Sequence, residues 1–96
     1  MAKLTAKPRH TLYVLRSEKD ERLYTGVTAD LPQRLRDHAA GKVNSTRHRR
    51  PLRLVYSESF NEKSEAWAQE RYFKTPEGGA LKRRLISERA ADSLIE

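Results

Sequence analysis

Residues 11–27 read TLYVLRSEKDERLYTGV, in which two apolar runs are separated by the polar stretch 17–21. This pattern is the sequence signature of a β-hairpin, and we expect its strands at 11–16 and 22–27. Further along the chain, apolar residues alternate with polar ones and indicate a third strand at 52–60. The alternating residues are Leu52, Leu54, Tyr56 and Phe60. The chain is therefore expected to contain a small antiparallel sheet.

The hairpin brings two tyrosines to the same face of this sheet. If Arg16 pairs with Leu23, then Tyr13 lies opposite Gly26, and the alternation of side chains puts Tyr13 and Tyr24 on one face. Gly26 has no side chain, so it is expected to leave an empty space beside Tyr13. A substrate backbone could then approach both phenols closely.

The first helix is expected at residues 30–40. Asp30 is a good N-cap, Gln33 stands where a capping-box partner belongs, and Gly41 is a C-terminal stop signal. The residues expected to face the core are Leu31, Leu35 and Ala39.

Two more helices are expected after the third strand. Asn61 would cap a helix that runs to about Lys74, and Pro76 with the pair Gly78-Gly79 would break it before a terminal helix at 80–88. The order β-β-α-β-α-α predicts an α+β fold, with a three-stranded antiparallel sheet flanked by helices.

Length and charge set the broad class of the protein. A chain of 96 residues has room for one modest core, which we place at 11–88, between a flexible basic arm at 1–10 and a tail at 89–96. Twenty Lys and Arg residues against thirteen Asp and Glu residues give a net charge of +7, which is typical of a partner that carries phosphates. Surface charge for solubility would look the same.

Cysteine content and hydropathy exclude other classes. With no cysteine in the chain, disulfides and thiolate metal sites are excluded. No apolar run approaches the eighteen or so residues that a membrane span needs, and the first nine residues lack the apolar core of a signal peptide. We therefore expect a cytoplasmic protein that binds no membrane and is a monomer.

Glu70 is the residue whose position is most informative. On a helix it shares one narrow arc with Ala66 and Phe73, so a carboxylate stands in an apolar stripe. Such a carboxylate is costly unless it is paired or binds a cation. The residues alone allow a buried salt bridge to Arg34 or Lys74, or a metal site.

Arg34 and His38 are spaced i, i+4 and project from one side of the first helix. Arg34 could hold a phosphate through two parallel hydrogen bonds, or could be a solvated surface arginine. For His38, a hydrogen bond to a tyrosine or a phosphate and a partly buried structural role are equally supported. The basic segment that follows contributes candidate phosphate contacts at Arg47, Arg49, Arg50 and Arg53.

The ordered set of motifs resembles the GIY-YIG nuclease superfamily, in particular its small stand-alone bacterial members. The two name-giving motifs appear as residues 11–13 and 24–26, followed by Asp30-Leu31-x-x-Arg34-Leu35-x-x-His38 and by Lys63-Ser64-Glu65-Ala66 with Glu70-x-x-x-Lys74. The resemblance covers roughly residues 11–85. Any one of these motifs alone would be weak evidence, because short motifs have many false matches.

The resemblance implies a divalent-metal-dependent endonuclease that hydrolyses DNA. Glu70 would hold Mg²⁺ or Mn²⁺, Arg34 would clamp the phosphate, Tyr13 would activate water, and Tyr24 would orient the water. Gly26 and His38 complete the expected catalytic set. Because a phenol is a poor base at its usual pKa, the pKa of the acting tyrosine is expected to be lowered by Arg34, a metal or the second phenol.

Some positions depart from the family pattern. Thr11 and Thr25 replace a glycine and an isoleucine of the motifs, Val27 replaces a polar residue, and no asparagine stands between Lys74 and Gly79. Reduced activity, or a non-catalytic nucleic-acid-binding module with the same fold, is therefore the alternative. The sequence leaves open whether RNA is cut and whether a partner protein or the shape of the DNA directs cleavage.

Overall fold

The computed structural model describes residues 9–95, with the side chains of residues 9–90. Most of the arm expected at 1–10 lies outside the described residues. Three strands form one antiparallel sheet in the order β2-β1-β3: β1 (His10–Ser17), β2 (Leu23–Thr28) and β3 (Leu52–Phe60). The predicted hairpin register is confirmed, because Arg16 pairs with Leu23 and Tyr13 with Gly26.

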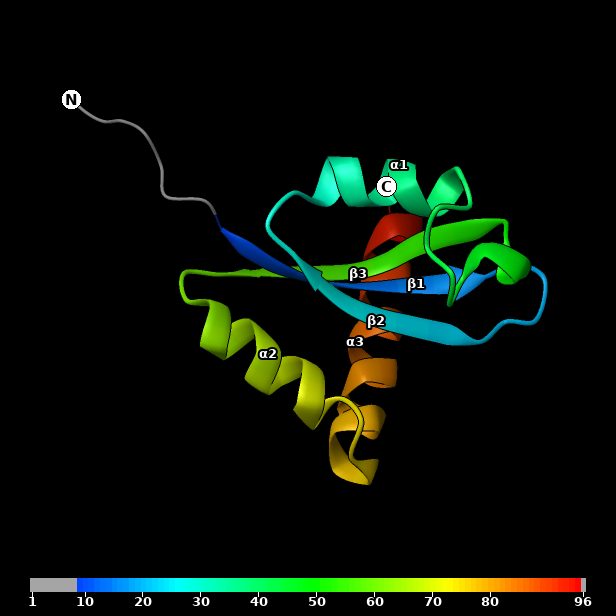
Figure 1. Cartoon of the computed structure of the whole chain (residues 1–96). Coiled ribbons are helices and arrows are strands. Elements are labelled where there is room, and N and C mark those ends of the chain that lie inside the picture. The colour runs from blue at the N-terminus through cyan, green and yellow to red at the C-terminus, as the bar shows by residue number, and fades with distance from the viewer. Residues whose placement is uncertain (1–8, 96) are drawn as a thin grey trace.

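Helices lie on both sides of the sheet, as expected for an α+β fold. Helix α1 (Leu31–Ala39) covers one face, and α2 (Lys63–Tyr72) lies on the other (Figure 1). Helix α3 (Pro76–Ile95) runs from the end of α2 towards β3. A short 3₁₀ turn, η1 (Arg47–Arg49), lies between α1 and β3. The sheet thus separates α1 from α2.

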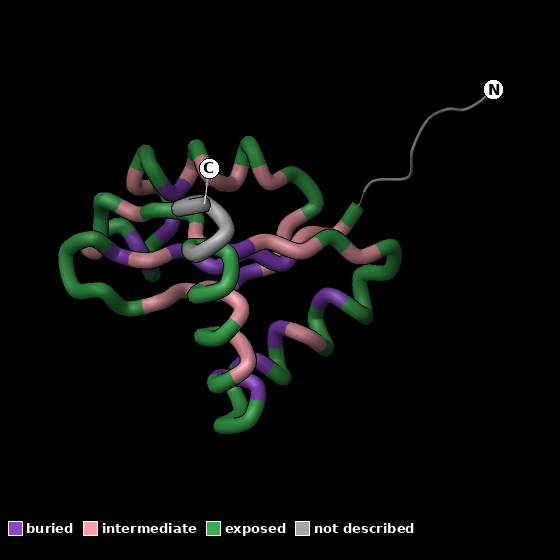
Figure 2. The backbone as a smooth tube through the Cα atoms, turned by 180° about the vertical axis from the view of Figure 1, so that it is seen from behind, coloured by how far each residue is buried: buried purple, intermediate pink, exposed green. Residues whose placement is uncertain are grey.

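The two faces of the sheet differ in chemistry. Leu12 and Val14 of β1 point to the α2 side and form the apolar core with Tyr56 and Phe73. Figure 2 shows this buried stretch of β1 at the centre of the molecule. Burying each such side chain contributes about 1.5–3 kcal/mol to the stability of the fold. The opposite face carries Tyr13 and is available for polar chemistry.

The third strand is confirmed at 52–60, but its apolar residues do not all lie on one face, as strict alternation would require. A register irregularity between Val14 and Leu15 of β1 makes Val14 pair with Tyr56 but Leu15 pair with Leu54, so the alternation in β3 shifts by one residue. A bulge of this kind reverses the direction of the side chains beyond it. Leu54 therefore lies on the α1 side of the sheet and Tyr56 on the core side.

The first helix differs in part from expectation. Asp30 does cap it by accepting a hydrogen bond from the Gln33 backbone N–H at 3.2 Å, but the Gln33 side chain bonds Asp37 instead of completing a capping box. Ala39 is exposed rather than in the core. The buried residue of this helix is His38.

The boundaries of the last two helices also differ. The N-cap of α2 is Glu62, not Asn61, and its side chain makes no capping bond. The predicted break between the two helices is present, since α2 ends at Tyr72 and α3 begins at Pro76. The expected start of the last helix at Ala80 is wrong, because α3 includes both glycines and continues to Ile95. It thus includes residues 89–95, which the sequence assigned to a tail.

Close packing against the end of α2 explains why a glycine stands at position 78 of α3. A Cβ atom added at Gly78 would overlap the backbone carbonyl of Tyr72 at the end of α2. The glycine therefore lets the two helices meet closely, which outweighs its poor helix propensity.

Candidate active site

Tyr13 is the centre of a polar cluster on the α1 side of the sheet. The strand pairing puts it opposite Gly26, and its side chain is almost completely buried. A Cβ atom added at Gly26 would lie 2.6 Å from the Tyr13 hydroxyl oxygen. The space that we expected to be open to substrate is therefore filled by the tyrosine ring, and the role of Gly26 is to let that ring lie across β2.

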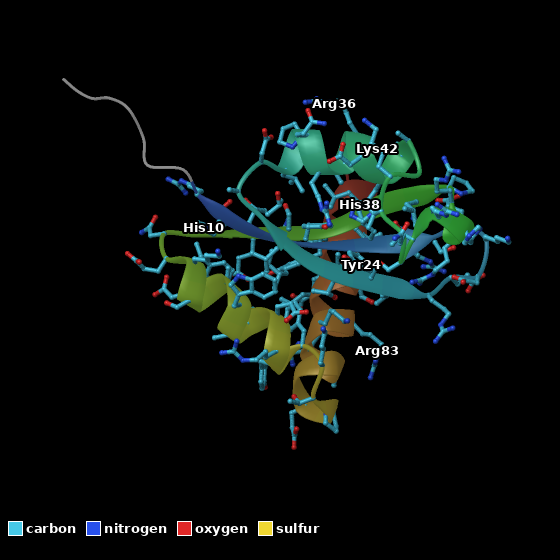
Figure 3. All side chains as sticks on the ribbon, viewed as in Figure 1. His10, Tyr24, Arg36, His38, Lys42 and Arg83 are labelled. Atoms are coloured by element: carbon cyan, nitrogen blue, oxygen red, sulfur yellow. The ribbon has the colours of Figure 1, made fainter. Side chains whose placement is uncertain are left out.

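Tyr24 belongs to the same cluster. Its ring centroid lies 6.2 Å from that of Tyr13 and 5.2 Å from that of His38. Figure 3 shows His38 between α1 and the sheet and Tyr24 on the neighbouring strand. The hairpin and α1 thus bring together the three rings that the sequence placed in one site.

Helix α1 adds the polar partners of the Tyr13 hydroxyl. Arg34 donates a hydrogen bond from Nε to the Tyr13 oxygen at 3.3 Å, and His38 Nε2 lies 2.9 Å from the same oxygen. The i, i+4 spacing brings both groups to one phenol. By contrast, Arg36 points away from the sheet (Figure 3) and bonds Gln33.

Thr46 completes the cluster and was missed by the sequence analysis. It is fully buried in the loop after α1, and its Oγ1 lies 2.8 Å from His38 Nδ1. The four side chains form a hydrogen-bonded chain from Arg34 through Tyr13 and His38 to Thr46. Nothing in the local sequence marks Thr46, because the chain reversal after α1 alone brings it to the imidazole.

Electrostatics favours a neutral phenol and a neutral imidazole in the free protein. Burial raises the pKa of Tyr13 above its ordinary value of 10.0, and the hydrogen bond from Arg34 offsets this only in part. The expected lowering of the tyrosine pKa is therefore wrong. Burial, together with the positive charge of Arg34, lowers the pKa of His38 below 6.5.

One arrangement of the hydrogen bonds is consistent with these protonation states and satisfies all four side chains. Arg34 can only donate to the Tyr13 oxygen. If Tyr13 donates its proton to His38 Nε2, then His38 carries its own proton on Nδ1 and donates it to Thr46. In this arrangement every polar group is satisfied, and the phenol proton already points at a base.

The lowered pKa of His38 predicts an acid-dependent loss of stability. Below pH 6.5 the unfolded chain binds the proton more readily than the folded one, so the stability contributed by neutral His38 is present above pH 6.5 and is lost as the pH falls through the folded pKa. We expect urea unfolding to show this slope in the wild type. A His38→Gln variant should have a flatter slope, and an unchanged slope would contradict the assignment. His48→Gln, at an exposed position, is the matched control.

Glu70 lies in a different layer from the tyrosine cluster. It is buried on α2, beneath the sheet, with Ala66 and Phe73 as predicted. Its Oε2 forms an ion pair with Nζ of Lys74, and the two atoms are 2.6 Å apart. Lys74 is one of the two partners that the sequence suggested. The structure therefore joins Tyr13, Tyr24, Arg34 and His38 but does not bring Glu70 into contact with them.

Lys82 is a second residue that the sequence analysis missed. It donates a hydrogen bond from Nζ to Thr25 Oγ1 of β2 at 3.2 Å, so a threonine that departs from the family motif has a structural partner. Burial, with the nearby charges of Arg83 and Lys74, lowers the pKa of Lys82. No signal in the sequence marks this contact, because it joins residues that are 57 positions apart in the chain.

A pocket lies where β1 begins and β2 ends. It is lined by Arg34 of α1 and by Lys63 and Trp67 of α2, together with His10 and residues 27–29. Glu70 does not line this pocket.

The four arginines expected to contact phosphate have different surroundings. Arg49 pairs with Asp20 and Arg53 with Glu18. Within residues 9–95, Arg47 and Arg50 have no acidic partner. The role of the four arginines in binding stays a prediction. Arg47 and Arg50 are the better candidates, because no acidic side chain among the described residues competes for them.

The chain belongs to the GIY-YIG family: the model of the GIY-YIG catalytic domain matches residues 9–83. This confirms the resemblance drawn from the motifs. Among residues 9–95, no helix combines the length and apolar character needed to cross a membrane.

Similar proteins share the designation UPF0213. The chain is 44% identical to a UPF0213 protein of Staphylococcus haemolyticus over 68 residues, covering 70% of this chain and 82% of that one. It is 41% identical to one of Natronomonas pharaonis over 80 residues, covering 82% and 92%. A solution NMR structure of the UPF0213 protein BH0048 from Bacillus halodurans has a TM-score of 0.51 at 36% identity, covering 82% and 83% of the two chains.

Proposed function

We propose that the protein is an endonuclease that hydrolyses DNA phosphodiester bonds in a structure-directed way during repair or processing. The observation that carries this proposal is the buried chain of hydrogen bonds from Arg34 through Tyr13 and His38 to Thr46. An apolar side chain would fill this space at a lower cost in free energy, because buried polar groups must be compensated by hydrogen bonds. A buried phenol between a cation and a neutral imidazole therefore favours a chemical role.

The cluster can remove a proton from water. As the Tyr13 oxygen takes a proton from the attacking water, its own proton passes to His38 Nε2, and the hydroxide forms a bond to phosphorus. The bond from phosphorus to the leaving oxygen breaks, and this oxygen takes a proton from solvent water. Burial and the charge of Arg34 lower the pKa of His38, and the negative charge of a bound phosphate would act against that lowering and help the imidazole to hold the proton. The raised pKa of Tyr13 is then no obstacle, since no free phenolate need accumulate.

Arg34 connects this proton path to the phosphate. Its Nε–H is used by Tyr13, and the hydrogen bond raises the pKa of the guanidinium, which stays charged throughout. The guanidinium also interacts with Tyr24, so it lies between the two phenols of the cluster. We propose that its Nη groups hold phosphate oxygens, where the developing negative charge is greatest.

A divalent metal is implied by the family, and Glu70 offers a minimal site for it. Among residues 9–95, no cluster of three His, Cys, Asp or Glu side chains could hold a metal ion. Mg²⁺, however, needs only one or two carboxylates when waters and phosphate oxygens complete its shell. Glu70 already holds a cation, the ammonium of Lys74, and that lysine is exposed enough to be displaced. When bound, Mg²⁺ or Mn²⁺ would supply charge neutralisation at the phosphate.

Thr46 offers a test of the proton path that leaves the reacting groups in place. Thr46→Val keeps the shape but removes the acceptor of the His38 Nδ1 proton, so a buried hydrogen bond worth about 1–3 kcal/mol is lost. We expect kcat to fall by roughly 5- to 150-fold with little change in KM. The measurement is steady-state cleavage combined with ¹⁵N NMR of the His38 tautomer. An unchanged tautomer together with an unchanged kcat would remove Thr46 from the mechanism.

A cleavage panel separates the nuclease from a binding module. The purified chain is incubated with Mg²⁺ or Mn²⁺ and supercoiled, branched or single-stranded DNA, or RNA, and binding is measured in parallel. The proposal expects cleavage of DNA, strongest on branched substrates. Binding to every substrate with cleavage of none would identify a non-catalytic module, and preferential cleavage of RNA would correct the substrate class.

A further inference from the structure

A separate cavity adjoins the tyrosine cluster on the α1 side of the sheet. It has a volume of about 740 Å³, within the range of roughly 300–1,000 Å³ that is usual for small-molecule sites. His38 lies in its wall, and the same ring contacts Tyr13 through Nε2. The His38 side chain therefore contacts both the cavity and the Tyr13 hydroxyl of the proposed reaction centre.

The floor of this cavity is apolar. It is formed by Leu15 of β1, Leu35 of α1, and Leu52 and Leu54 of β3. The bulge in β3 turns Leu54 to this side of the sheet, where its side chain remains 39% exposed. A large exposed apolar residue within a lined cavity favours a ligand with an apolar face, because a hydrated phosphate would gain nothing from such a floor.

The polar lining of the cavity is basic. It is formed by Lys19, Arg47 and Arg50, with His48, whose Nε2 accepts a hydrogen bond from Arg47 Nε. No carboxylate lines the cavity, and within residues 9–95 none of these four side chains forms an ion pair. Arg50 is held in place by hydrogen bonds to the backbone carbonyls of Arg47 and Ala39. Positive charge above an apolar floor matches a ligand that has an anionic edge and a flat apolar body.

We propose that this cavity binds one unpaired nucleotide of the nucleic-acid strand, with its base on the leucine floor and its phosphates at Arg47 and Arg50. This inference rests on the proposed function, since the strand at the tyrosine cluster is what brings the nucleotide within reach. A base in a duplex cannot enter such a cavity without leaving the stack. The site therefore selects strands with an unpaired nucleotide beside the cleavage point.

Neighbouring alanines provide a matched pair of variants. Ala39 lines the cavity, whereas Ala40 is the next residue and does not line it. Both are exposed at the end of α1, so Ala39→Leu and Ala40→Leu should both fold. Only the first adds bulk to the cavity. Thermal unfolding of both variants checks this.

The test is equilibrium binding without divalent metal, so that cleavage plays no part. The probes are a blunt DNA duplex, the same duplex with a short single-stranded extension, and a free mononucleotide as competitor. Ala39→Leu should weaken binding of the extended duplex by about tenfold, the share that one stacked base commonly supplies, and leave the blunt duplex unchanged. Ala40→Leu should change neither.

Three results would overturn the proposal. Equal weakening of both duplexes would make the cavity part of a general phosphate surface, and no weakening of either would exclude it from binding. Competition by the mononucleotide at the affinity of the extended duplex would make it a site for free nucleotides. Because no arm depends on cleavage, a chain that shows the expected pattern but cuts nothing would refute the nuclease and leave the cavity assignment standing.

Discussion

Tyr13→Phe is expected to lower the rate of DNA cleavage by roughly 10²- to 10⁴-fold. The change removes only a hydroxyl, but that hydroxyl lies between Arg34 Nε and His38 Nε2 and is the atom that would take the proton from water. Affinity for DNA should be nearly unchanged, because the phosphate contacts come from arginines. Single-turnover cleavage and equilibrium binding measured on the same preparation separate the two effects.

Tyr24→Phe and Tyr72→Phe are the controls for this experiment. Tyr24 lies in the cluster, and its ring is close to His38, but the path of hydrogen bonds that we describe does not pass through it. Tyr72 is 43% exposed on α2. We expect a modest loss for Tyr24→Phe and none for Tyr72→Phe. Should Tyr24→Phe cause the large loss and Tyr13→Phe a small one, the roles of base and water-orienting group must be exchanged.

Glu70→Gln is expected to lower the rate of metal-dependent DNA cleavage by roughly 10³-fold or more, because a metal supplies several kcal/mol of charge stabilisation. The stability of the metal-free protein should change by less than about 1 kcal/mol. The ion pair with Lys74 has one partner that is largely exposed, so its loss costs little. Removal of a buried carboxylate offsets even that cost. Cleavage and urea unfolding are the two measurements.

Two variants of α2 make the Glu70 experiment decisive. Glu65→Gln removes an exposed carboxylate from the same helix and should change neither property. Lys74→Ala breaks the ion pair but keeps the carboxylate, so a metal ligand predicts retained cleavage. A Glu70→Gln protein that is clearly destabilised and still cuts with metal would show that the glutamate is structural.

The hairpin and its register could be predicted from sequence because they depend on local alternation. A strand has a period of two, so the pairing of Arg16 with Leu23 by itself decides that Tyr13 meets Gly26 and that Tyr24 shares its face. The i, i+4 spacing likewise brought Arg34 and His38 to one phenol. These parts of the site follow from patterns within short segments.

The rest depends on contacts between distant segments. The bulge that turns Leu54 towards α1 results from pairing across the sheet, and Gly78 stands within α3 because the helix packs closely against Tyr72 at the end of α2. The ring of Tyr13 fills the space beside Gly26 only because α1 holds its hydroxyl. Thr46 reaches His38 through the fold of a loop that has no regular pattern.

The direction of the pKa shift of Tyr13 could not be predicted from neighbouring charges in the sequence, because the loss of water around the phenol depends on the folded structure. Burial is the largest influence on the pKa of Tyr13 and raises it, despite the adjacent guanidinium. A base with a raised pKa needs a partner that accepts its proton, and His38 has that place in the structure.

The proposed nuclease activity is tested by nicking of supercoiled DNA with the purified chain and with Tyr13→Phe, each with and without added Mg²⁺ or Mn²⁺. We expect nicks that require the metal, that disappear when it is chelated, and whose rate falls at least a hundredfold in the variant. Metal-dependent nicking at the same rate in wild type and Tyr13→Phe would contradict the proposed role of the buried phenol, and DNA binding without nicking under either metal would contradict the nuclease itself.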